Sequence, residues 1–578
     1  MRADLLEGAQ SASQLDYYAG TTSLSKANFD VLVIGSGAAG SFATHELTSR
    51  GLSVLLLEAG RAITPNDFPE NFEGPREKGI QLWARIRAAL TGQRIQSRVA
   101  FYGKQQRHLF VKDREHPYST PPGRPYLWIR GKQLGGRLHV YGRVLLRWSD
   151  FDFRAASHDG LGENWPLNYL ELAPYYDRVE RLLQIRGCME GIANLPDGMF
   201  AGPSKLTPAE TDFKVATAAR WPERRATSWR YMPPNINRIP QPILAAQASG
   251  RLTIRSDAIV RRILTDAVTG KATGVEFVDR QSGAIETEMA RVVMVCASPI
   301  ESVRLLLNSA GDRHPKGLGN NSGHLGRYFM DQVPNLIMGT VPGHTGWVQD
   351  DTVPPDPFYG VSGGIYLPRY ENLTTVTNAA FARGFAYQGT IGRLYASESK
   401  PAKFALMGFG EMLPHAENRV QLHPSRKDRW GIPIPHIDVQ MRGNEIAMLR
   451  EQCRAIFEMA TNAGLDTEFV GSYLGLEEHG RGAFPEADWF SRSLFRKSFC
   501  GSMAIGAAIH ESGGARMGRD PSRSVLGPFN QCWDAPNVFV CDASAFPTGG
   551  CAGTTLTVMA MSSRASEYLA RELSTGSI

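Results

Sequence analysis

Residues 29–61 read "FDVLVIGSGAAGSFATHELTSRGLSVLLLEAGR". The run "VLVI" is short and fully apolar, which is typical of a buried parallel strand. The glycine-rich "GSGAAG" follows at once, then a helix-like stretch through Ser49 and a second apolar run, "SVLLLE". This order predicts a strand, a glycine loop, a helix and a second strand within about thirty residues, the first unit of a doubly wound α/β sheet.

Each glycine of the loop has a distinct physical role in such a unit. Gly35 allows the tight turn after the strand, and Gly37 lets the backbone approach a pyrophosphate. Gly40 lets the helix pack closely on the strand. The phosphates are expected at the helix N-terminus, where free N–H groups and a partial positive charge favour an anion. The alternative is a glycine-rich turn in an unrelated α/β protein.

The end of the second strand indicates which dinucleotide is bound. Glu58 is placed to accept hydrogen bonds from both hydroxyls of a ribose. Because the acid is a glutamate and is followed by Ala59, Gly60 and Arg61, we expect FAD rather than NAD.

Composition excludes several other classes of protein. A chain of 578 residues is too long for one ordinary core, so two or three domains are expected. The 63 basic residues are interleaved with 57 acidic ones, which gives no nucleic-acid footprint. The seven cysteines are scattered without a CxxC, which argues against a disulfide framework and against a thiolate metal site.

The sequence also gives an expectation for location. The first thirty residues lack a continuous apolar segment of the signal-peptide kind. No apolar run reaches the roughly 18 residues that span a bilayer. We therefore expect a cytoplasmic protein, periplasmic only if it is exported with a signal-bearing partner.

Two later stretches read as further pieces of the dinucleotide domain. Residues 250–311 alternate apolar and polar positions in several short strands and end in a helix, and residues 537–575 read as a strand, a turn and a closing helix. We therefore predict a discontinuous, doubly wound Rossmann-type FAD-binding domain formed by residues 28–160, 250–335 and 500–578. Residues 161–249 and 336–499 are expected to form a second α+β domain, built around a sheet, that binds the substrate.

Motifs spread over nearly the whole chain resemble the glucose–methanol–choline (GMC) family of FAD-dependent oxidoreductases. They are "GSGAAG" with "LLLEAGR", "RGKQLGGRLHVYGRVLLR" (130–147), "CASPIESVRLLLNS" (296–309), and "HESGGARMG" with "VFVCDASAFP". The stretches "SDFDF" and "WPLNYLELAPYYDRVE" look more like the bacterial branch that includes pyranose oxidases and glucoside 3-dehydrogenases than like fungal glucose oxidase.

The resemblance implies a set of cofactor contacts. "GKQLGG" would run along the flavin pyrophosphate and ribityl chain, and Val260 would hold the adenine through its backbone. Some family members bind the flavin covalently through a histidine that usually falls one place later than His139. A packing role for His139 and a non-covalent FAD are therefore expected, with a covalent link through His139 as the alternative. The residues that the resemblance assigns to the cofactor are Arg130, Gly135, Gly136, His139, Tyr141, Val260, Ala297, Asp542, Ala543, Thr554 and Thr555.

His510 is the expected catalytic base. Oxidising an alcohol requires removal of the hydroxyl proton while the carbon-bound hydrogen leaves as hydride, and histidine suits this role because its ordinary pKa is near 6.5. His510 lies in the glycine-rich "AIHESGGARMG" and matches the family's catalytic histidine.

The usual second catalytic residue is missing. The family places a His or Asn on the following loop, and the alignment through "TLT" puts Gly553 at that position. Thr554 or a loop of the substrate domain could fill the gap, or His510 could act alone. In the third alternative, the chain is a flavoprotein with non-redox, lyase-like chemistry.

The substrate expected from the resemblance is a sugar or glycoside, or more broadly a small alcohol. Three aromatic residues, Trp347, Phe358 and Tyr359, are candidates either for stacking on it or for loop packing. Oxygen, a quinone or a partner protein would accept the electrons. A small subunit or a homo-oligomer is possible, and no metal ligand set is expected.

Overall fold

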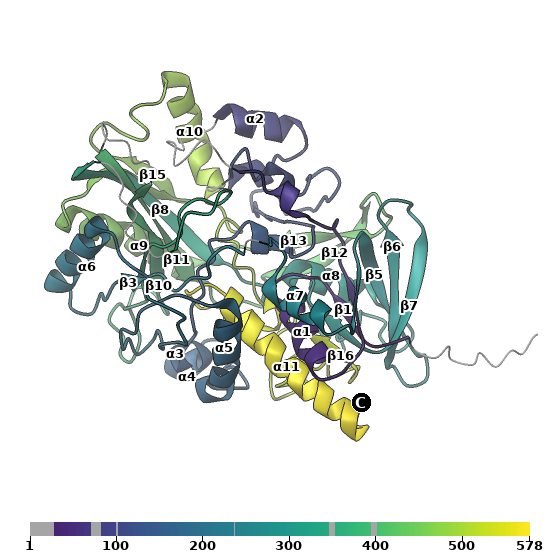
Figure 1. Cartoon of the computed structure of the whole chain (residues 1–578). Coiled ribbons are helices and arrows are strands. Elements are labelled where there is room, and N and C mark those ends of the chain that lie inside the picture. The colour runs from purple at the N-terminus through teal and green to yellow at the C-terminus, as the bar shows by residue number, and fades with distance from the viewer. Residues whose placement is uncertain (1–27, 71–81, 100–101, 236, 346–352, 395–400) are drawn as a thin grey trace, which may run out of the picture.

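The computed structural model describes residues 28–70, 82–99, 102–235, 237–345, 353–394 and 401–578. Two seven-stranded sheets organise this part of the chain and lie on opposite sides of Figure 1. A smaller hairpin, β12 (Arg419–Lys427) with β13 (Pro433–Asp438), lies beside the first sheet and contacts helix α8 (Pro299–Asn308). The cavity described below is lined by residues from both sheets.

The first sheet has the strand order β4-β2-β1-β7-β6-β5, and β16 pairs with β7. Strands β4, β2, β1 and β16 are parallel to their partners, whereas β5, β6 and β7 form an antiparallel meander. The predicted doubly wound α/β unit is therefore confirmed. Its strands are β1 (Phe29–Ile34), β2 (Val54–Leu57), β4 (Leu252–Arg255), β5 (Ala258–Thr265), β6 (Ala272–Asp279), β7 (Ile285–Val295) and β16 (Val538–Val540).

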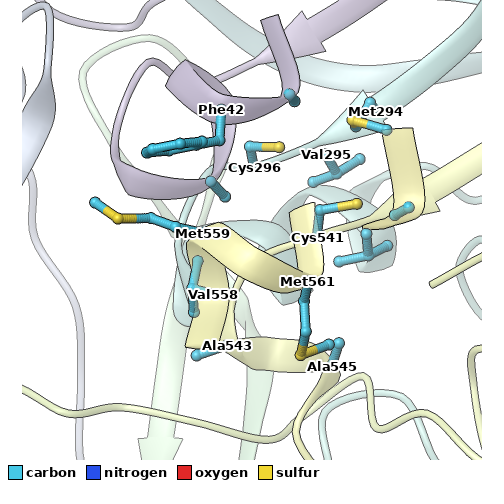
Figure 2. Packing of buried hydrophobic residues seen from close by; sticks show 14 of the residues in the cluster. Phe42, Met294, Val295, Cys296, Cys541, Ala543, Ala545, Val558, Met559 and Met561 are labelled. Carbon is cyan, nitrogen blue, oxygen red and sulfur yellow. The ribbon is translucent and has the colours of Figure 1, made fainter. Parts of the chain in front are cut away.

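Helices α1 (Ala38–Ser49) and α11 (Thr555–Thr575) pack against each other over this sheet. Figure 2 shows Phe42 of α1 close to Cys296, which follows β7, and to Met559 of α11. All three side chains are buried. Three stretches that are far apart in the sequence therefore share one core.

The second sheet is entirely antiparallel, with the order β15-β14-β8-β11-β10-β9-β3. Helix α9 (Gly443–Asn462) covers β8, β11 and β14, and α6 (Pro208–Arg220) lies against β10. The strands are β3 (Thr227–Ser228), β8 (Gln332–Thr345), β9 (Ile365–Leu367), β10 (Phe385–Leu394), β11 (Pro401–Glu411), β14 (Asp466–Ser472) and β15 (Gly475–Glu478).

The two sheets draw their strands largely from the segments assigned to the two domains. Two details differ from the assigned ranges: β8 begins at Gln332, and the β12–β13 hairpin of the 336–499 segment contacts the first unit. The remaining helices are α2 (Leu82–Leu90), α3 (Asp150–Phe153), α4 (Ala155–Asp159), α5 (Tyr169–Leu183), α7 (Gln241–Ala248) and α10 (Trp489–Ser502), with short 3-10 turns at Pro65–Asp67, Gln96–Arg98, Arg107–Leu109, Gly136–His139 and Ala543–Ala545.

Within the described ranges, no helix is both long and apolar enough to cross a bilayer. The same residues contain no cluster of three or more His, Cys, Asp or Glu side chains that could hold a metal ion. All seven cysteines are free thiols.

Candidate active site

A cavity of about 370 Å³ lies between the glycine loop after β1, the segment 129–144, the stretch around His510 and strands β10 and β11. Most of the predicted site residues line it: Gly35, Gly37, Glu58, Ala59, Arg130, Gly136, Tyr141, Val260, Ala297, His510, Asp542, Ala543, Thr554 and Thr555. Five others do not line it: Gly40, Gly60, Arg61, Gly135 and His139.

The glycine loop has the shape that a dinucleotide requires. Gly35 has a φ of +96°, and a Cβ on it would lie 2.5 Å from the carbonyl oxygen of Cys296. A Cβ on Gly40 would lie 1.8 Å from the carbonyl oxygen of Gly35. A Cβ on Gly37, by contrast, would meet no atom within 4 Å. Gly37 and Ala38 line the cavity, so the N-terminus of α1 borders open space in which a phosphate fits.

The side chain of Glu58 is hydrogen-bonded to this loop. Its carboxylate accepts hydrogen bonds from the backbone N–H and hydroxyl of Ser36, at 3.1 and 2.5 Å, and from the N–H of Gly60 at 2.8 Å. Burial raises its pKa, and the hydrogen bonds from Ser36 and Gly60 oppose that rise. Gly60 approaches another backbone, since a Cβ on it would lie 2.0 Å from the carbonyl of Lys132. Arg61 forms an ion pair with Asp67 at 2.8 Å.

His139 faces away from the main cavity, toward a smaller one of about 50 Å³. Its Nε2 lies 2.8 Å from the carbonyl oxygen of Leu134, and burial lowers its pKa to about 4. The ring packs on Phe68 at a centroid distance of 5.3 Å. A Cβ on Gly135 would lie 2.4 Å from His139 Nε2, so the ring supports the glycine turn.

His510 lies in the cavity wall, and its Nδ1, its backbone N–H and one part of its ring have protein partners. Its Nδ1 is 2.6 Å from Oε1 of Gln332, and its backbone N–H donates to Asp331 Oδ1 at 3.0 Å. The ring packs on Phe409 at a centroid distance of 5.2 Å. Burial, and secondarily the cation of Arg137, lower the pKa of His510 to about 4. The imidazole is therefore neutral at pH 7 and able to accept a proton.

The loop position assigned by alignment lies directly beside this ring. A Cβ on Gly553 would be 3.7 Å from His510 Nε2, an ordinary van der Waals contact, and the φ of Gly553 is not in the left-handed region. Thr554 lines the cavity next to it and is the N-cap of α11, without a side-chain capping hydrogen bond. The space next to Nε2 is thus open.

Four polar residues around His510 were missed by sequence reasoning. Glu511 pairs with Arg137 at 2.6 Å. Asp331 also accepts from the N–H of Gln332 at 2.7 Å, and both burial and the nearby Glu511 raise the pKa of Asp331. Glu511 could have been noticed because it follows His510 in the motif. Asp331 and Gln332 match no motif: Gln332 is the first residue of β8 in the other sheet, and Asp331 directly precedes it.

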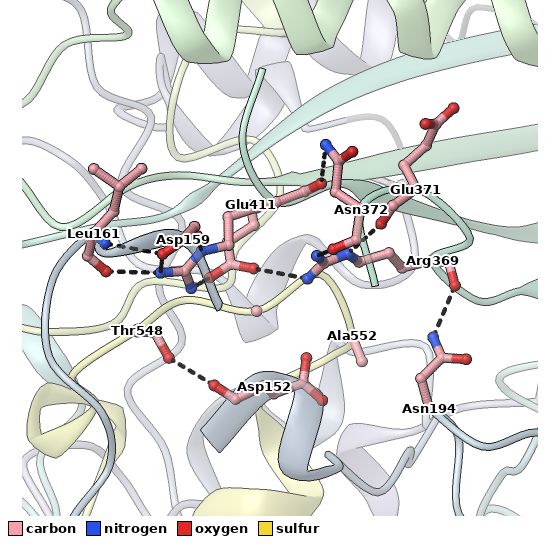
Figure 3. A network of polar contacts seen from close by, with 12 residues as sticks. Asp152, Asp159, Leu161, Asn194, Arg369, Glu371, Asn372, Glu411, Thr548 and Ala552 are labelled. Carbon is pink, nitrogen blue, oxygen red and sulfur yellow. Dashed lines mark hydrogen bonds and ion pairs between the residues drawn. The ribbon is translucent and has the colours of Figure 1, made fainter. Parts of the chain in front are cut away.

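An ion-pair network supports the end of that sheet (Figure 3). Glu411, the last residue of β11, is opposite Gln332 on β8. Arg383 donates to Glu411 at 2.9 Å and also binds Asp159. Arg369 lies 3.9 Å from the other oxygen of Glu411. Figure 3 shows this network in the same region as Ala552, on the loop that leads to Gly553.

The second sheet contributes three neighbouring side chains to the cavity: Gln388, Met407 and Phe409. Gln388 is opposite Met407 in the β10–β11 register. It is the polar member of the three, and no hydrogen bond to its side chain occurs among the described residues. The surface that the second sheet contributes to the cavity is therefore apolar apart from the amide of Gln388.

The aromatic residues considered at first lie elsewhere. Phe358 is buried against Phe68 and Tyr359, with centroid distances of 5.2 and 4.8 Å. Tyr359 donates a hydrogen bond to the carbonyl of His139 at 3.0 Å. Neither residue lines the main cavity, and Trp347 lies outside the described residues.

Comparison with known families agrees with this geometry. Two family models described as GMC oxidoreductase match residues 239–333 and 414–562, and a model of an NAD(P)-binding Rossmann-like domain matches residues 33–85. The 2-methyl-1,2-propanediol dehydrogenase of Mycolicibacterium austroafricanum is 29% identical, over 94% of this chain and 96% of its own. The fructose dehydrogenase large subunit of Gluconobacter japonicus is 24% identical, over 95% and 98%.

Solved structures share the fold. The pyridoxine 4-oxidase of Mesorbium loti superposes with a TM-score of 0.58 at 19% identity, covering 94% of this chain and 99% of that protein. Both GMC models match in the expected order, and the Rossmann-like match falls on the glycine loop. The chain therefore belongs to the GMC oxidoreductase family, the FAD-dependent oxidoreductases of CH–OH groups that its motifs resemble.

Proposed function

We propose that the protein oxidises an alcohol to the corresponding carbonyl compound, with FAD as cofactor and His510 as the base. The observation that carries this proposal is the position of His510 Nε2, which borders open space at Gly553 in the same cavity as the dinucleotide loop. FAD would be held by the loop 35–40, the N-terminus of α1 and Glu58. The chemistry that FAD supplies when bound is acceptance of the hydride.

Residues of the chain accept the hydroxyl proton of the alcohol. Nε2 of His510 takes the hydroxyl proton as the carbinol carbon loses hydride, which makes an alkoxide-like and therefore better hydride donor. Its lowered pKa keeps the ring neutral at pH 7. The nearby cation of Arg137 is paired with the carboxylate of Glu511. The proposed cofactor is non-covalent, because His139 is bonded to a backbone carbonyl outside the cavity.

We also propose a substrate class: an alcohol that carries a second hydroxyl near the reacting carbon, as diols, sugars and glycosides do. The support is Gln388, an amide that has no hydrogen-bond partner among the described residues and lies on the otherwise apolar surface that the second sheet contributes to the cavity. The two relatives named above, which act by name on a propanediol and on fructose, belong to this class. Oxygen, a quinone or a partner protein would then reoxidise the cofactor, with a small subunit or self-association as further options.

The test is anaerobic reduction of the purified flavoprotein by a panel of diols, sugars and glycosides. Bleaching of the oxidised flavin band supports the proposal, and His510→Ala should slow it by roughly 10²–10⁴-fold. His158→Ala, at an exposed position, is the matched control and should leave the rate unchanged. A bound flavin that no alcohol reduces would favour the alternative of non-redox, lyase-like chemistry suggested by Gly553.

A further inference from the structure

The amide of Gln332 has one possible orientation. Its Nε2 donates to the carbonyl oxygens of Gly550 and Ala552, at 2.9 and 3.0 Å. With the amide reversed, its oxygen would face both carbonyl oxygens and two hydrogen bonds would be lost. Oε1 is therefore the atom that faces His510.

This orientation determines which nitrogen of His510 carries the proton. An amide oxygen can only accept a hydrogen bond, so the Nδ1 atom 2.6 Å away must donate one. A neutral imidazole has a single N–H, so Nε2 is left with a free lone pair. Nε2 is the atom beside the open position at Gly553.

We propose that Gln332 is a positioning residue that holds His510 in the tautomer with an unprotonated Nε2, the one form of the neutral ring that can accept a proton from the cavity. This inference rests on the proposed function of His510 as a base. Gln332 acts through His510 and does not line the cavity itself.

The surroundings of Gln332 hold its side chain in place against the imidazole of His510. Its side chain is fully buried, and Glu411 opposite it is held by two arginines. The preceding residue, Asp331, binds the backbone N–H of His510. Asp331, directly before β8, and Gln332, the first residue of β8, thus hold the backbone and the ring of His510.

Replacement of Gln332 by glutamate keeps an oxygen that can accept the hydrogen bond from His510 Nδ1 and removes the amide NH₂ group. The charged groups around His510 are Arg137 from the 136–139 turn, Glu511 next to His510, Asp331 directly before β8 and Glu411 on β11. In Gln332→Glu one carboxyl oxygen still accepts from Nδ1–H, and the other takes up a proton so that it can donate to the carbonyl oxygens of Gly550 and Ala552. The tautomer should therefore be preserved, and flavin reduction should keep the acid limb of the unmodified protein.

Gln332→Met removes the acceptor and keeps the volume. The proton can then occupy either ring nitrogen, and loss of one hydrogen bond predicts a reduction rate lowered about tenfold. Gln452→Met is the matched control, because Gln452 is also fully buried and bonded to Asn335 at 2.9 Å, away from His510. It should not change the pH profile.

The measurement that does not depend on turnover is ¹⁵N NMR of the histidine-labelled holoenzyme, with the His510 signals identified by their loss in His510→Ala. We expect a protonated Nδ1 and an unprotonated Nε2 at pH 7 in the unmodified protein and in Gln332→Glu, and a mixture of tautomers in Gln332→Met. A protonated Nε2 in the unmodified protein would overturn the inference, as would an unchanged tautomer in Gln332→Met. If instead the tautomer is as expected but His510→Ala reduces flavin normally, the proposed function fails and the assignment of Gln332 as a positioning residue fails with it.

Discussion

Two glycine-containing loops border the same cavity, and their glycines are present for different reasons. In the loop 35–40, a Cβ on Gly35 or Gly40 would enter the van der Waals radius of a backbone carbonyl. In the loop 549–553, a Cβ on Gly553 would make an ordinary contact with His510, and the backbone there is not left-handed. The fold requires Gly35 and Gly40 and does not require Gly553. The open space at Gly553 is thus a property of the site and can be changed without breaking the fold.

The largest effect is expected for Gly40→Ala. Its Cβ would lie 1.8 Å from a backbone oxygen, so α1 must move off the sheet. We expect little folded holoenzyme and loss of bound flavin, measured by absorbance and thermal unfolding. Gly37→Ala is the informative partner, because its Cβ meets nothing within 4 Å and Gly37 lines the cavity. It should fold normally and bind flavin more weakly; equal behaviour of the two variants would break the comparison.

The second prediction concerns pH at the base beside Gly553. Because the pKa of His510 is lowered to about 4, the rate of anaerobic flavin reduction should be level from pH 7 to 5 and fall about tenfold per unit below pH 4. The same shift destabilises the fold in acid, since the unfolded chain takes up this proton near pH 6.5 and the folded one only near 4. Stability should therefore decline as pH falls through that window. A rate that falls already at pH 6.5 would show that the ring is solvated.

The third prediction concerns Gln388, on the surface that the second sheet contributes to the cavity. Gln388→Leu removes the amide and should lower kcat/KM for 1,2-propanediol about tenfold, the value of one hydrogen bond. The kcat/KM for 1-propanol, which lacks the second hydroxyl, should stay the same. Equal losses with both alcohols would mean that Gln388 supports the fold and does not recognise the substrate.

The smallest effects are expected at Gly553 itself. Gly553→Ala should change the free energy of unfolding by less than about 1 kcal/mol, because the site accepts a Cβ without a clash. Gly553→Asn places an amide beside Nε2 and should raise kcat/KM for small alcohols by a few-fold through one added hydrogen bond. A large loss of stability in Gly553→Ala would contradict the comparison, whereas a loss of activity in Gly553→Asn would show that the substrate occupies this space.

Sequence reasoning succeeded where the determinants are local. The βαβ unit was predictable because apolar runs and glycines at fixed spacing encode a strand, a turn and a helix within one short stretch. The structure places α1 at Ala38–Ser49 and the closing helix at Thr555–Thr575, where the patterns indicated them. The position of Gly553 beside His510 also followed, because both lie in stretches that the family alignment fixes.

The parts of the site that were missed depend on contacts between distant segments. Gln332 reaches His510 only because β8 of the second sheet begins beside the 550–553 loop. A lone glutamine at the start of a strand has no spacing or composition that marks it. Gln388 is similar, since its neighbours Met407 and Phe409 are set by the register of β10 with β11.

The order of the strands in the first sheet also constrains how the protein is made. The central strand β7 takes β1 on one side and β16 on the other, and α11 covers α1. During synthesis β1 gains its strand partners β2 and β7 early, whereas β16 and α11, which complete the sheet and cover α1, leave the ribosome only after the whole second sheet. Pairing of such distant segments is slow and leaves apolar strands uncovered in the meantime. We expect nascent chains that stop before β16 to be chaperone clients, and the flavin site to form as a late step of biogenesis.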